Sequence, residues 1–317
     1  DYHGNPSILI DREGFLHVFY GGHNKKMRYS RSSKPLSNDD WEDYTSRLPY
    51  TESTYPQLFV MSDGTIYSFY RRKTHRGNWS YVTSKDNGRT WSKEVHVLDG
   101  RSPPGNGWYT AFTKDPNRDH IHLMFLWHAS KDNLPHSRRN LYYMHMDHSA
   151  GKWTSMKNEK LNTPLSFEEA NGKAMIFDSK NKYSSIPQHW VTVDERPVGL
   201  NRISEDDGVA IRHLHVWTGE TWRTQKVPID VMLKPTKKEW VGFRSREGTV
   251  QRFTSKDEGA NWTPGEVVLK TDGEQNLNAL FAEAHPDAVL VIVDKLDEQR
   301  VPGKQRLWVW GAAGFLD

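Results

Sequence analysis

Short hydrophobic runs separated by turn residues recur along the chain, and two of them align without a gap at an offset of 50 residues, 6–20 on 56–70. The identical positions are Pro6/Pro56, Gly14/Gly64, Phe19/Phe69, Tyr20/Tyr70 and, further on, Trp41/Trp91. Each copy predicts a strand, a tight turn at the glycine, a second strand, a loop and a third strand before a Trp. A period of this length is typical of stacked or radial copies of one unit. The pattern therefore predicts antiparallel meanders, which are the material of β-propeller blades.

Six such units can be counted, at about 6–41, 56–91, 108–153, 189–222, 229–262 and 277–310. The stretch 155–185 is less regular, and a short helix is expected to begin at Ser166. The sixth unit shows only three strands, whereas propellers usually close by pairing strands from both chain ends, because closure removes exposed sheet edges. We therefore predict an all-β fold with a single propeller domain over 1–317. We expect four-stranded antiparallel blades and seven of them in all, the N-terminal part being missing from this chain.

Two turns share the pattern Ser-x-Asp-x-Gly-x-x-Trp, at 84–91 and 255–262. In each, the aspartate can accept hydrogen bonds from its own turn, the glycine tolerates positive φ, and the tryptophan can pack between sheets. The pattern resembles the Asp-box, or BNR, repeat of sialidase-like propellers. Asp boxes are usually structural turns away from the active site, so the resemblance implies structural roles for Asp86 and Asp257.

The composition is that of a folded protein that packs on aromatic side chains. Of 317 residues 35% are hydrophobic and 12% aromatic, including 13 Trp and 13 Tyr. The net charge of +3 suits a polyanionic partner, and no Lys/Arg run resembles a nucleic-acid footprint. No apolar run reaches the roughly 18 residues that span a membrane. The chain has 0 Cys, which excludes disulfides and thiolate metal sites and fits a secreted or periplasmic bacterial protein.

Four titratable or charged side chains are expected on one face of the propeller. His3 and Tyr55 each precede the first strand of a unit, and His23 and Arg71 each follow the second strand of the same two units. In a blade, the entry of the first strand and the exit of the second lie at the same end, beside the axis. The repeat therefore predicts that His3, His23, Tyr55 and Arg71 converge.

Together these side chains suit proton abstraction next to a uronate carboxylate, followed by β-elimination. Histidine takes or gives a proton near neutral pH. Tyrosine can protonate a leaving oxygen or, with a lowered pKa, act as a base. Arginine can bind and neutralise the carboxylate, whose charge otherwise opposes loss of the α-proton.

The segments that carry these residues, Asp1-Tyr-His3-Gly-Asn5, Phe19-Tyr-Gly-Gly-His23, Tyr55-Pro56 and Phe69-Tyr-Arg71, resemble the BNR-type propeller polysaccharide lyases, notably the ulvan lyases. The resemblance implies His3 and Tyr55 as main acid and base, His23 as an assistant, and Arg71 as the neutralising group. It also implies an anionic polysaccharide as substrate, a sulfated rhamnose–uronate polymer in particular. We expect a monomer that binds no nucleic acid.

Further substrate-binding candidates lie around these four. The third unit repeats the arrangement with Tyr109 before its first strand and His128 after its second. Trp108, like Trp127 and Trp190, is expected to be exposed and able to stack on sugar rings. The complete set of binding candidates is Asn5, Arg72, Trp108, Tyr109, His128, Arg202 and Arg244.

Other functions stay open on the sequence alone. A related propeller group cleaves rhamnosyl–glucuronate linkages at chain ends, so exo action by a lyase or glycosidase is one alternative. A sialidase-like hydrolase would need an arginine triad, for which Arg71, Arg202 and Arg244 are nominal members. A non-catalytic glycan-binding propeller is the third alternative.

No cofactor is expected for the chemistry itself. His120/His122, His145/His148 and His213/His215 are close pairs, and alternate residues of a strand point to one face, which is a workable ligand geometry. Without a third ligand in the pattern, surface or hydrogen-bonded histidines are the simpler interpretation. A structural calcium or zinc ion remains the alternative.

Overall fold

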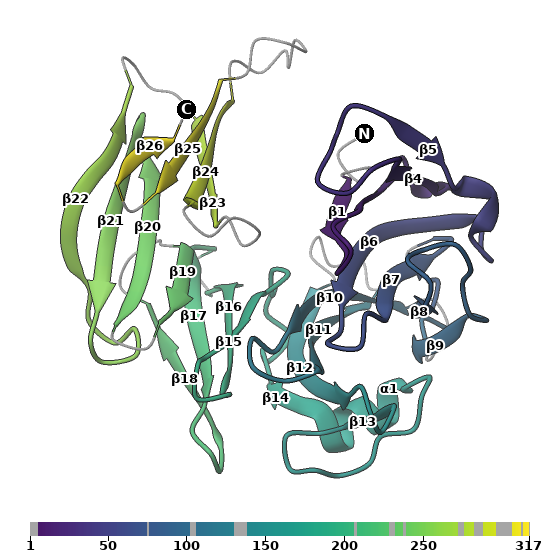
Figure 1. Cartoon of the computed structure of the whole chain (residues 1–317). Coiled ribbons are helices and arrows are strands. Elements are labelled where there is room, and N and C mark those ends of the chain that lie inside the picture. Colours follow the sequence, from purple (N-terminus) through teal and green to yellow (C-terminus); the bar gives the residue numbers. More distant parts are fainter. Residues whose placement is uncertain are drawn as a thin grey trace. The chain divides into compact units, whose positions relative to one another are not determined.

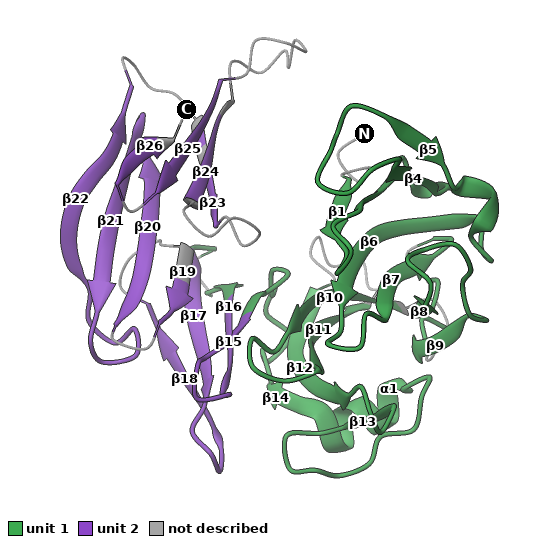
Figure 2. Ribbon diagram, in the orientation of Figure 1, with its two compact units in different colours: residues 1–189, 201–209 green, residues 190–200, 210–317 purple. Residues whose placement is uncertain are grey.

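The fold is described from a computed structural model (Figure 1). It describes residues 6–74, 76–101, 106–129, 138–205, 208–227, 232–236, 239–271, 276–281, 288–295, 306–311 and 313–316. Two compact units divide the chain, one of residues 1–189 and 201–209 and one of residues 190–200 and 210–317 (Figure 2). Within the described ranges, no helix is long and apolar enough to cross a membrane.

Three antiparallel sheets cover residues 7–177. The first contains β1 (Ser7–Ile10), β2 (Leu16–Tyr20), β4 (Arg28–Ser32) and β5 (Trp41–Asp43) in that order. The second contains β3 (His23–Lys26), β6 (Glu52–Val60), β7 (Ile66–Arg72), β8 (Trp79–Ser84) and β9 (Val95–Leu98). The third contains β10 (Asn106–Lys114), β11 (His120–Ala129), β12 (Arg138–Asp147) and β13 (Lys152–Thr154), and β14 (Met175–Phe177) also pairs with β12.

Three further sheets follow along the chain. The fourth contains β15 (Gln188–Val191), β16 (Pro197–Ser204), β17 (Ala210–Trp217) and β18 (Trp222–Lys226). The fifth contains β19 (Met232–Pro235), β20 (Trp240–Arg246), β21 (Thr249–Ser255) and β22 (Thr263–Lys270). The sixth contains β23 (Asn276–Phe281), β24 (Ala288–Lys295), β25 (Leu307–Gly311) and β26 (Gly314–Leu316).

These six meanders of four or five strands confirm the predicted all-β propeller fold. The sixth unit has four strands, not the three expected, because β26 pairs with β25 after a tight turn. The second sheet has a fifth strand because β3, which follows β2 in the first sequence repeat, pairs with β6 and not with the first sheet. A seventh blade and a single domain stay predictions.

In the part of the chain that the structure describes, helical structure is confined to short turns. They are η1 (Thr45–Arg47), α1 (Phe167–Glu169) and the π-type turn η2 (Ala170–Ala174). Ser166 caps α1 by accepting a hydrogen bond from the backbone N–H of Glu169, which satisfies a donor that the first helical turn leaves open. The short helix expected at Ser166 is therefore present.

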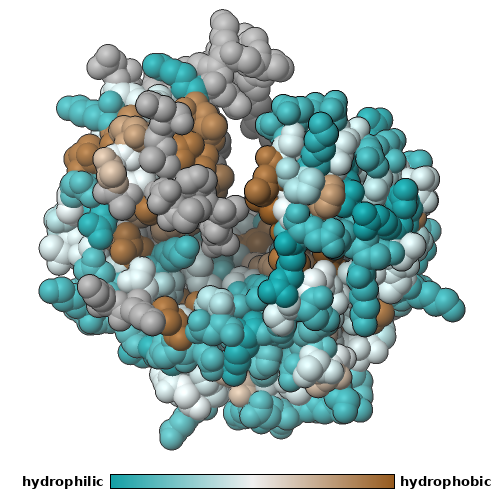
Figure 3. Space-filling view, in the orientation of Figure 1, coloured by the Kyte–Doolittle hydropathy of each residue, from teal (hydrophilic) through white to brown (hydrophobic). Residues whose placement is uncertain are grey.

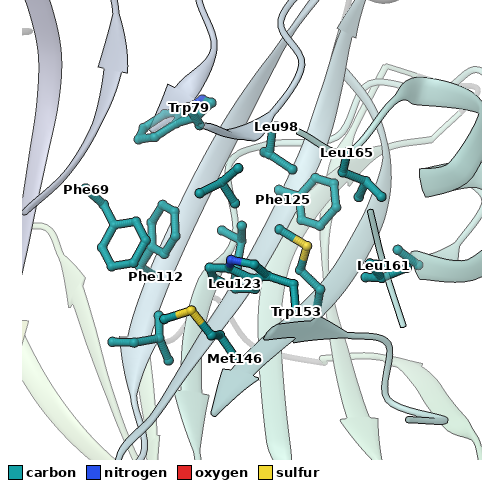
Figure 4. Packing of buried hydrophobic residues seen from close by; sticks show 14 of the residues in the cluster. Phe69, Trp79, Leu98, Phe112, Leu123, Phe125, Met146, Trp153, Leu161 and Leu165 are labelled. Atoms are coloured by element: carbon teal, nitrogen blue, oxygen red, sulfur yellow. The ribbon is translucent and has the colours of Figure 1, made fainter. Parts of the chain in front are cut away.

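The largest buried cluster joins the second and third sheets through aromatic side chains (Figure 4). Phe69 of β7 stacks on Phe112 of β10 with ring centroids 4.3 Å apart, and Trp153 meets Phe69 edge to face at 6.4 Å. Burying each such ring contributes about 1.5–3 kcal/mol. Most of the coloured residues on the face shown in Figure 3 are hydrophilic, with hydrophobic patches between them. The second and third sheets, which carry the candidate site, are thus joined by aromatic packing.

The two Asp boxes form the turns that the sequence predicts. Asp86 accepts hydrogen bonds from the Thr90 N–H at 2.8 Å and the Ser84 hydroxyl at 2.9 Å, and Asp257 repeats this with Asn261 and Ser255. Gly88 has φ +77°, and a Cβ there would lie 1.8 Å from the Tyr29 hydroxyl of the first sheet. The box therefore needs glycine both for its backbone and for close packing between sheets.

Candidate active site

A bulge in β6 places Tyr55 at the end of the second sheet. The register runs from Thr54 opposite Arg71 to Gln57 opposite Phe69, so β6 carries one extra residue over this span. Tyr55 has φ +59°, in the left-handed region that side chains other than glycine rarely adopt. Bulges redirect side chains, and backbone strain of this kind gathers at functional sites.

A row of paired residues crosses the same end of the sheet. His23 on β3 lies opposite Thr54 on β6, Thr54 lies opposite Arg71 on β7, and Arg71 lies opposite Trp79 on β8. Directly paired residues in antiparallel strands are about 4.5–5.5 Å apart and point to one face. The structure therefore places His23, Tyr55 and Arg71 at one end of the second sheet, with Tyr55 and Arg71 in contact and His23 two strands away from Arg71. His3 and Asn5 lie outside the described residues.

Arg71 is a buried cation beneath two tyrosine rings. Its side chain is 2% exposed, and its guanidinium carbon lies 4.9 Å from the ring centroid of Tyr55 and 5.6 Å from that of Tyr109. Among the described residues, its Nε and Nη1 have no hydrogen-bond partner. Burying a charged donor without an acceptor is costly, and arginine binds a carboxylate with two parallel hydrogen bonds. Arg71 is therefore the candidate partner for an anionic ligand group at this end of the sheet.

Tyr55 is protonated at neutral pH in this environment. Its ring stacks on Trp79 at 6.2 Å and 10° and meets Tyr109 at 6.2 Å. Burial is the main cause that raises the pKa of Tyr55, with Tyr109 adding to it, while Arg71 and Arg138 act in the opposite direction. A phenol with a raised pKa keeps its proton and can donate it to a leaving oxygen.

The third sheet contributes Tyr109 and His128, as its repeat suggested. Their rings lie 5.4 Å apart, and the guanidinium of Arg138 lies 4.3 Å from the Tyr109 ring centroid. Sequence reasoning missed Arg138. Its position opposite His128 in the β11–β12 register is the signal that would have found it, and this register is visible only in the folded sheet.

Trp108 is not an exposed stacking platform, so that prediction was wrong. It is 1% exposed, its indole N–H donates to the Asp99 carbonyl at 2.8 Å, and it packs edge to face on Phe125. Trp127 is half-buried and lies 4.4 Å from Phe167 between ring centroids. Both rings belong to the aromatic packing because strand alternation points them into the sheet interface.

The three arginines of the nominal triad differ in burial and in the compact unit to which they belong. Arg71 is buried and Arg202, in the same unit, is exposed on β16. Arg244 belongs to the other compact unit, where its guanidinium lies 5.0 Å from the Phe253 ring. The two arginines of the first unit thus differ in burial, and only Arg71 lies beneath the Tyr55 ring.

Arg72 points to the opposite face of β7 from Arg71 and pairs with Glu94. There it lines a concavity of about 500 Å³ with four further cationic or titratable residues. These are Lys73, Arg76, His96 and Arg101. None of the described lining residues is acidic. This cationic cavity can attract sulfate or carboxylate groups.

A second cavity, of about 410 Å³, opens beside Tyr55 and has no charged lining residue among those described. Tyr55, Trp79, Tyr109, Thr110, Gln188 and His189 contribute to its wall. A third cavity, of about 490 Å³ in the other unit, is lined by Arg196, whose charge already meets Asp194 at 2.7 Å and Glu258 at 2.6 Å. The cavity beside Tyr55 therefore fits best with the candidate acid and cation.

The paired histidines lie on strands of the sheets, except His148, which directly follows β12. His122 and His145 stack with ring centroids 5.8 Å apart, and His120 lies 6.3 Å from His122. Over the described ranges, no group of three or more His, Cys, Asp or Glu has a geometry that could hold a metal ion. His122 instead bonds to the Tyr143 hydroxyl, which indicates a structural role for this pair.

Comparison with known proteins places the chain among propeller enzymes. A family model described as BNR repeat-containing family member matches residues 1–229. An ulvan lyase of Nonlabens ulvanivorans is 28% identical, with 93% of this chain and 71% of the relative covered. The protein named Ulvan Lyase-PL25 of Pseudoalteromonas sp. (strain PLSV) is 25% identical, with 95% of this chain and 70% of the relative covered.

Solved structures support the fold. A structure described as a new family of polysaccharide lyase, PL25 ulvan lyase, has a TM-score of 0.87 at 24% identity. The match covers 99% of this chain and 80% of the chain in that structure. The polysaccharide lyase Uly1 has a TM-score of 0.73 at 13% identity and covers 93% of this chain and 75% of its own. The curated relatives confirm the predicted enzyme class, a polysaccharide lyase. With the family model matching most of its length, the chain belongs to the BNR repeat-containing family.

Proposed function

We propose that the chain cleaves a uronic-acid-containing polysaccharide by β-elimination, and that its substrate is a sulfated rhamnose–uronate polymer of the ulvan type. The observation that carries this proposal is the buried Arg71 guanidinium, which lies 4.9 Å from the Tyr55 ring centroid with Nε and Nη1 unpaired among the described residues. A uronate carboxylate would supply acceptors for the unpaired donors of this guanidinium. The relatives named ulvan lyases support the choice of polymer.

In the proposed reaction a base removes the proton on the carbon next to the uronate carboxylate. The electrons of that C–H bond form a carbon–carbon double bond as the bond to the glycosidic oxygen breaks. The departing oxygen takes a proton from the acid, so no water is consumed. Arg71 stabilises the negative charge that builds on the carboxylate during proton loss. The step needs no cofactor because both proton transfers are made by side chains.

We assign the acid role to Tyr55, since burial raises its pKa and keeps the phenol protonated. The base is then a histidine. His23 is half-buried and lies opposite Thr54, the residue before Tyr55, which places it at the same strand end. His3 stays a candidate for the same role from the resemblance to the lyases.

The cationic cavity supports a polyanionic substrate. Arg72 lines it directly after Arg71 in β7, and alternation along the strand points the two side chains to opposite faces. Its cations would attract sulfate or further uronate groups of the same chain. Tyr109 and His128 are proposed to contact the sugar next to Tyr55. Action as a secreted or periplasmic monomer fits a substrate too large to enter a cell.

The test is formation of an unsaturated uronate, followed by ultraviolet absorbance and by mass of the products, on ulvan, glycosaminoglycans and arabinogalactan. Ulvan should give absorbing fragments with no added mass of water. Even-sized internal fragments would indicate endo action, and a single small product would indicate exo action. Products that gain water would indicate a hydrolase, and binding with no product would indicate a glycan-binding module; either result contradicts the lyase proposal.

A further inference from the structure

Tyr55 must keep a negative charge when it acts as the acid of the proposed elimination. The residue is half-buried, and its ring centroid lies 6.2 Å from those of Trp79 and Tyr109. A charge taken out of water costs free energy unless an opposite charge or a hydrogen bond compensates it. The groups around Tyr55 therefore decide how readily the phenol gives up its proton.

The titratable and charged groups that face Tyr55 come from the second and third sheets. Burial is the main cause that raises the pKa of Tyr55, and the charge of Tyr109 adds to it, whereas Arg71 and Arg138 lower it. The Tyr55 and Tyr109 side chains are also hydrogen-bonded to each other. His128 is one ring further away, 5.4 Å from Tyr109 between centroids. Two cations thus offset the cost of a charge on this phenol.

Both guanidiniums lie against the Tyr109 ring. The guanidinium carbon of Arg138 is 4.3 Å from the ring centroid, and that of Arg71 is 5.6 Å from it. In the proposed reaction Arg71 binds the uronate, so the carboxylate offsets its charge while substrate is bound. Nη1 of Arg138 donates to the Tyr183 hydroxyl at 3.4 Å, and this neutral acceptor leaves the positive charge in place. Arg138 is therefore the cation that still opposes a charge on Tyr55 once the uronate has bound.

We propose that Arg138 is a positioning residue for this reaction and that, acting through Tyr109, it stabilises the phenolate that Tyr55 becomes as the leaving oxygen takes its proton. The inference rests on the proposed function, because it assigns the acid role to Tyr55. When the O–H bond of Tyr55 breaks, the proton goes to the glycosidic oxygen and the electron pair stays on the phenolate oxygen. That oxygen accepts a hydrogen bond from the Tyr109 hydroxyl, which the adjacent guanidinium of Arg138 makes a stronger donor. Tyr55 then regains a proton from solvent, and the base returns to solvent the proton that it took from the sugar.

The first experiment measures ionisation at Tyr55 without relying on turnover. A fluorotyrosine replaces Tyr55, and its fluorine NMR signal is followed as pH rises, in the otherwise unchanged protein and together with Arg138→Gln or Arg138→Lys. Fluorine withdraws electrons, so this phenol loses its proton at a lower pH than tyrosine does. The midpoint should move to higher pH with Arg138→Gln, because loss of a positive charge favours the neutral phenol. With Arg138→Lys, which keeps the charge, the midpoint should stay close to that of the unchanged protein.

The second experiment measures activity on ulvan with Tyr55 intact. We expect kcat to fall by about three- to tenfold in Arg138→Gln with KM within about twofold, and Arg138→Lys to recover most of the loss. Arg47→Gln is the matched control, since the guanidinium carbon of Arg47 lies 4.1 Å from the ring centroid of another tyrosine, Tyr44. In a Tyr109→Phe protein, Arg138→Gln should have a smaller effect, because residues that act together are not additive.

An unshifted midpoint in Arg138→Gln would overturn the proposal, and so would a shifted midpoint with unchanged kcat. Equal losses of kcat in Arg138→Gln and Arg138→Lys, with lower melting temperatures in both, would indicate damaged packing and would also overturn it. A shifted midpoint in a protein that forms no unsaturated uronate from ulvan would refute the lyase reaction and the role of Arg138 in it. The charge coupling between Arg138 and Tyr55 would stand in that case, so the two failures are distinguishable.

Discussion

The guanidinium carbon of Arg71 lies 4.9 Å from the centroid of the Tyr55 ring. The two residues come from different strands, and a bulge with a left-handed Tyr55 brings them into contact. This contact couples a buried cation to a protonated phenol, the two groups that a uronate elimination requires at one sugar. Replacing Tyr55 and replacing Arg71 should therefore have separable effects on activity.

Replacing Tyr55 by Phe removes the proposed acid and keeps the ring stacked on Trp79. We expect kcat on ulvan to fall by about 10²–10⁴-fold with a small change in KM, since general acid catalysis contributes about that much. The measurement is the initial rate of unsaturated uronate formation. Tyr81→Phe, a half-buried tyrosine of the same sheet outside the cavity lining, is the control. Full activity in Tyr55→Phe would remove the acid role.

Replacing Arg71 by Lys keeps the charge and loses the planar fork. We expect kcat/KM to fall at least about tenfold, because an ammonium cannot pair both carboxylate oxygens in the same geometry. Arg31→Lys is the matched control, since Arg31 is 3% exposed and lies 3.5 Å from the Phe15 ring centroid. Equal losses in both variants would point to damaged packing and not to a lost neutralising group.

The cationic cavity predicts a salt-dependent KM. Lys73→Gln and Arg101→Gln should each raise KM for ulvan by about two- to fivefold at low salt, the scale of an exposed ion pair. The difference should shrink as ionic strength rises, because salt screens exposed charges. Lys180→Gln removes the same charge from a lysine that is 81% exposed and paired with Asp178. An equal effect of Lys180→Gln would indicate a general charge effect.

Buried histidines predict acid sensitivity of the fold. Burial lowers the pKa of His145 to about 4, and those of His189 and His215 to about 3. An unfolded chain binds these protons near pH 6.5, so between about 6.5 and 4 the unfolded state is favoured as pH falls. The free energy of unfolding should drop by up to about 1.4 kcal/mol per histidine per pH unit. Urea unfolding from pH 7.5 to 4.5 measures it, and His215→Gln should make the slope shallower. A free energy of unfolding that does not change between pH 7.5 and 4.5 would contradict the burial of these histidines in the neutral form.

Alanine substitutions at Gly88 and Gly151 should distinguish the cost of a strained backbone from the cost of a steric clash. Both have positive φ, +77° and +61°, but a Cβ at Gly151 meets nothing within 4 Å. Gly151→Ala should cost about 1–2 kcal/mol for its backbone alone, and Gly88→Ala about 2–5 kcal/mol because it also collides with Tyr29. Thermal unfolding gives the comparison. Equal losses would mean that the Asp box tolerates a side chain against the first sheet.

The sequence repeat by itself predicts much of the fold. Glycine turns, alternating strands and the two Asp boxes are local features, and each depends on residues close together in the chain. Local spacing places Tyr55 and Arg71 at one strand end, because the entry of one strand and the exit of its paired neighbour share an end of the sheet. The prediction of Asp86 and Asp257 as turn residues matches their hydrogen bonds.

The tertiary structure decided which side chains are available for function. Trp108 and Trp127 have side chains of the kind that stack on sugar rings, yet in the third sheet Trp108 is buried and Trp127 is half-buried. Pairing of β3 with β6 set the place of His23, which lies opposite Thr54, and pairing of β11 with β12 set the place of Arg138 opposite His128. The sequence by itself determined the blades, their turns and the chemical groups. Only the folded sheets decided burial, the strained backbone of Tyr55 and the Arg71 nitrogens that have no partner among the described residues, because each of these depends on non-local contacts.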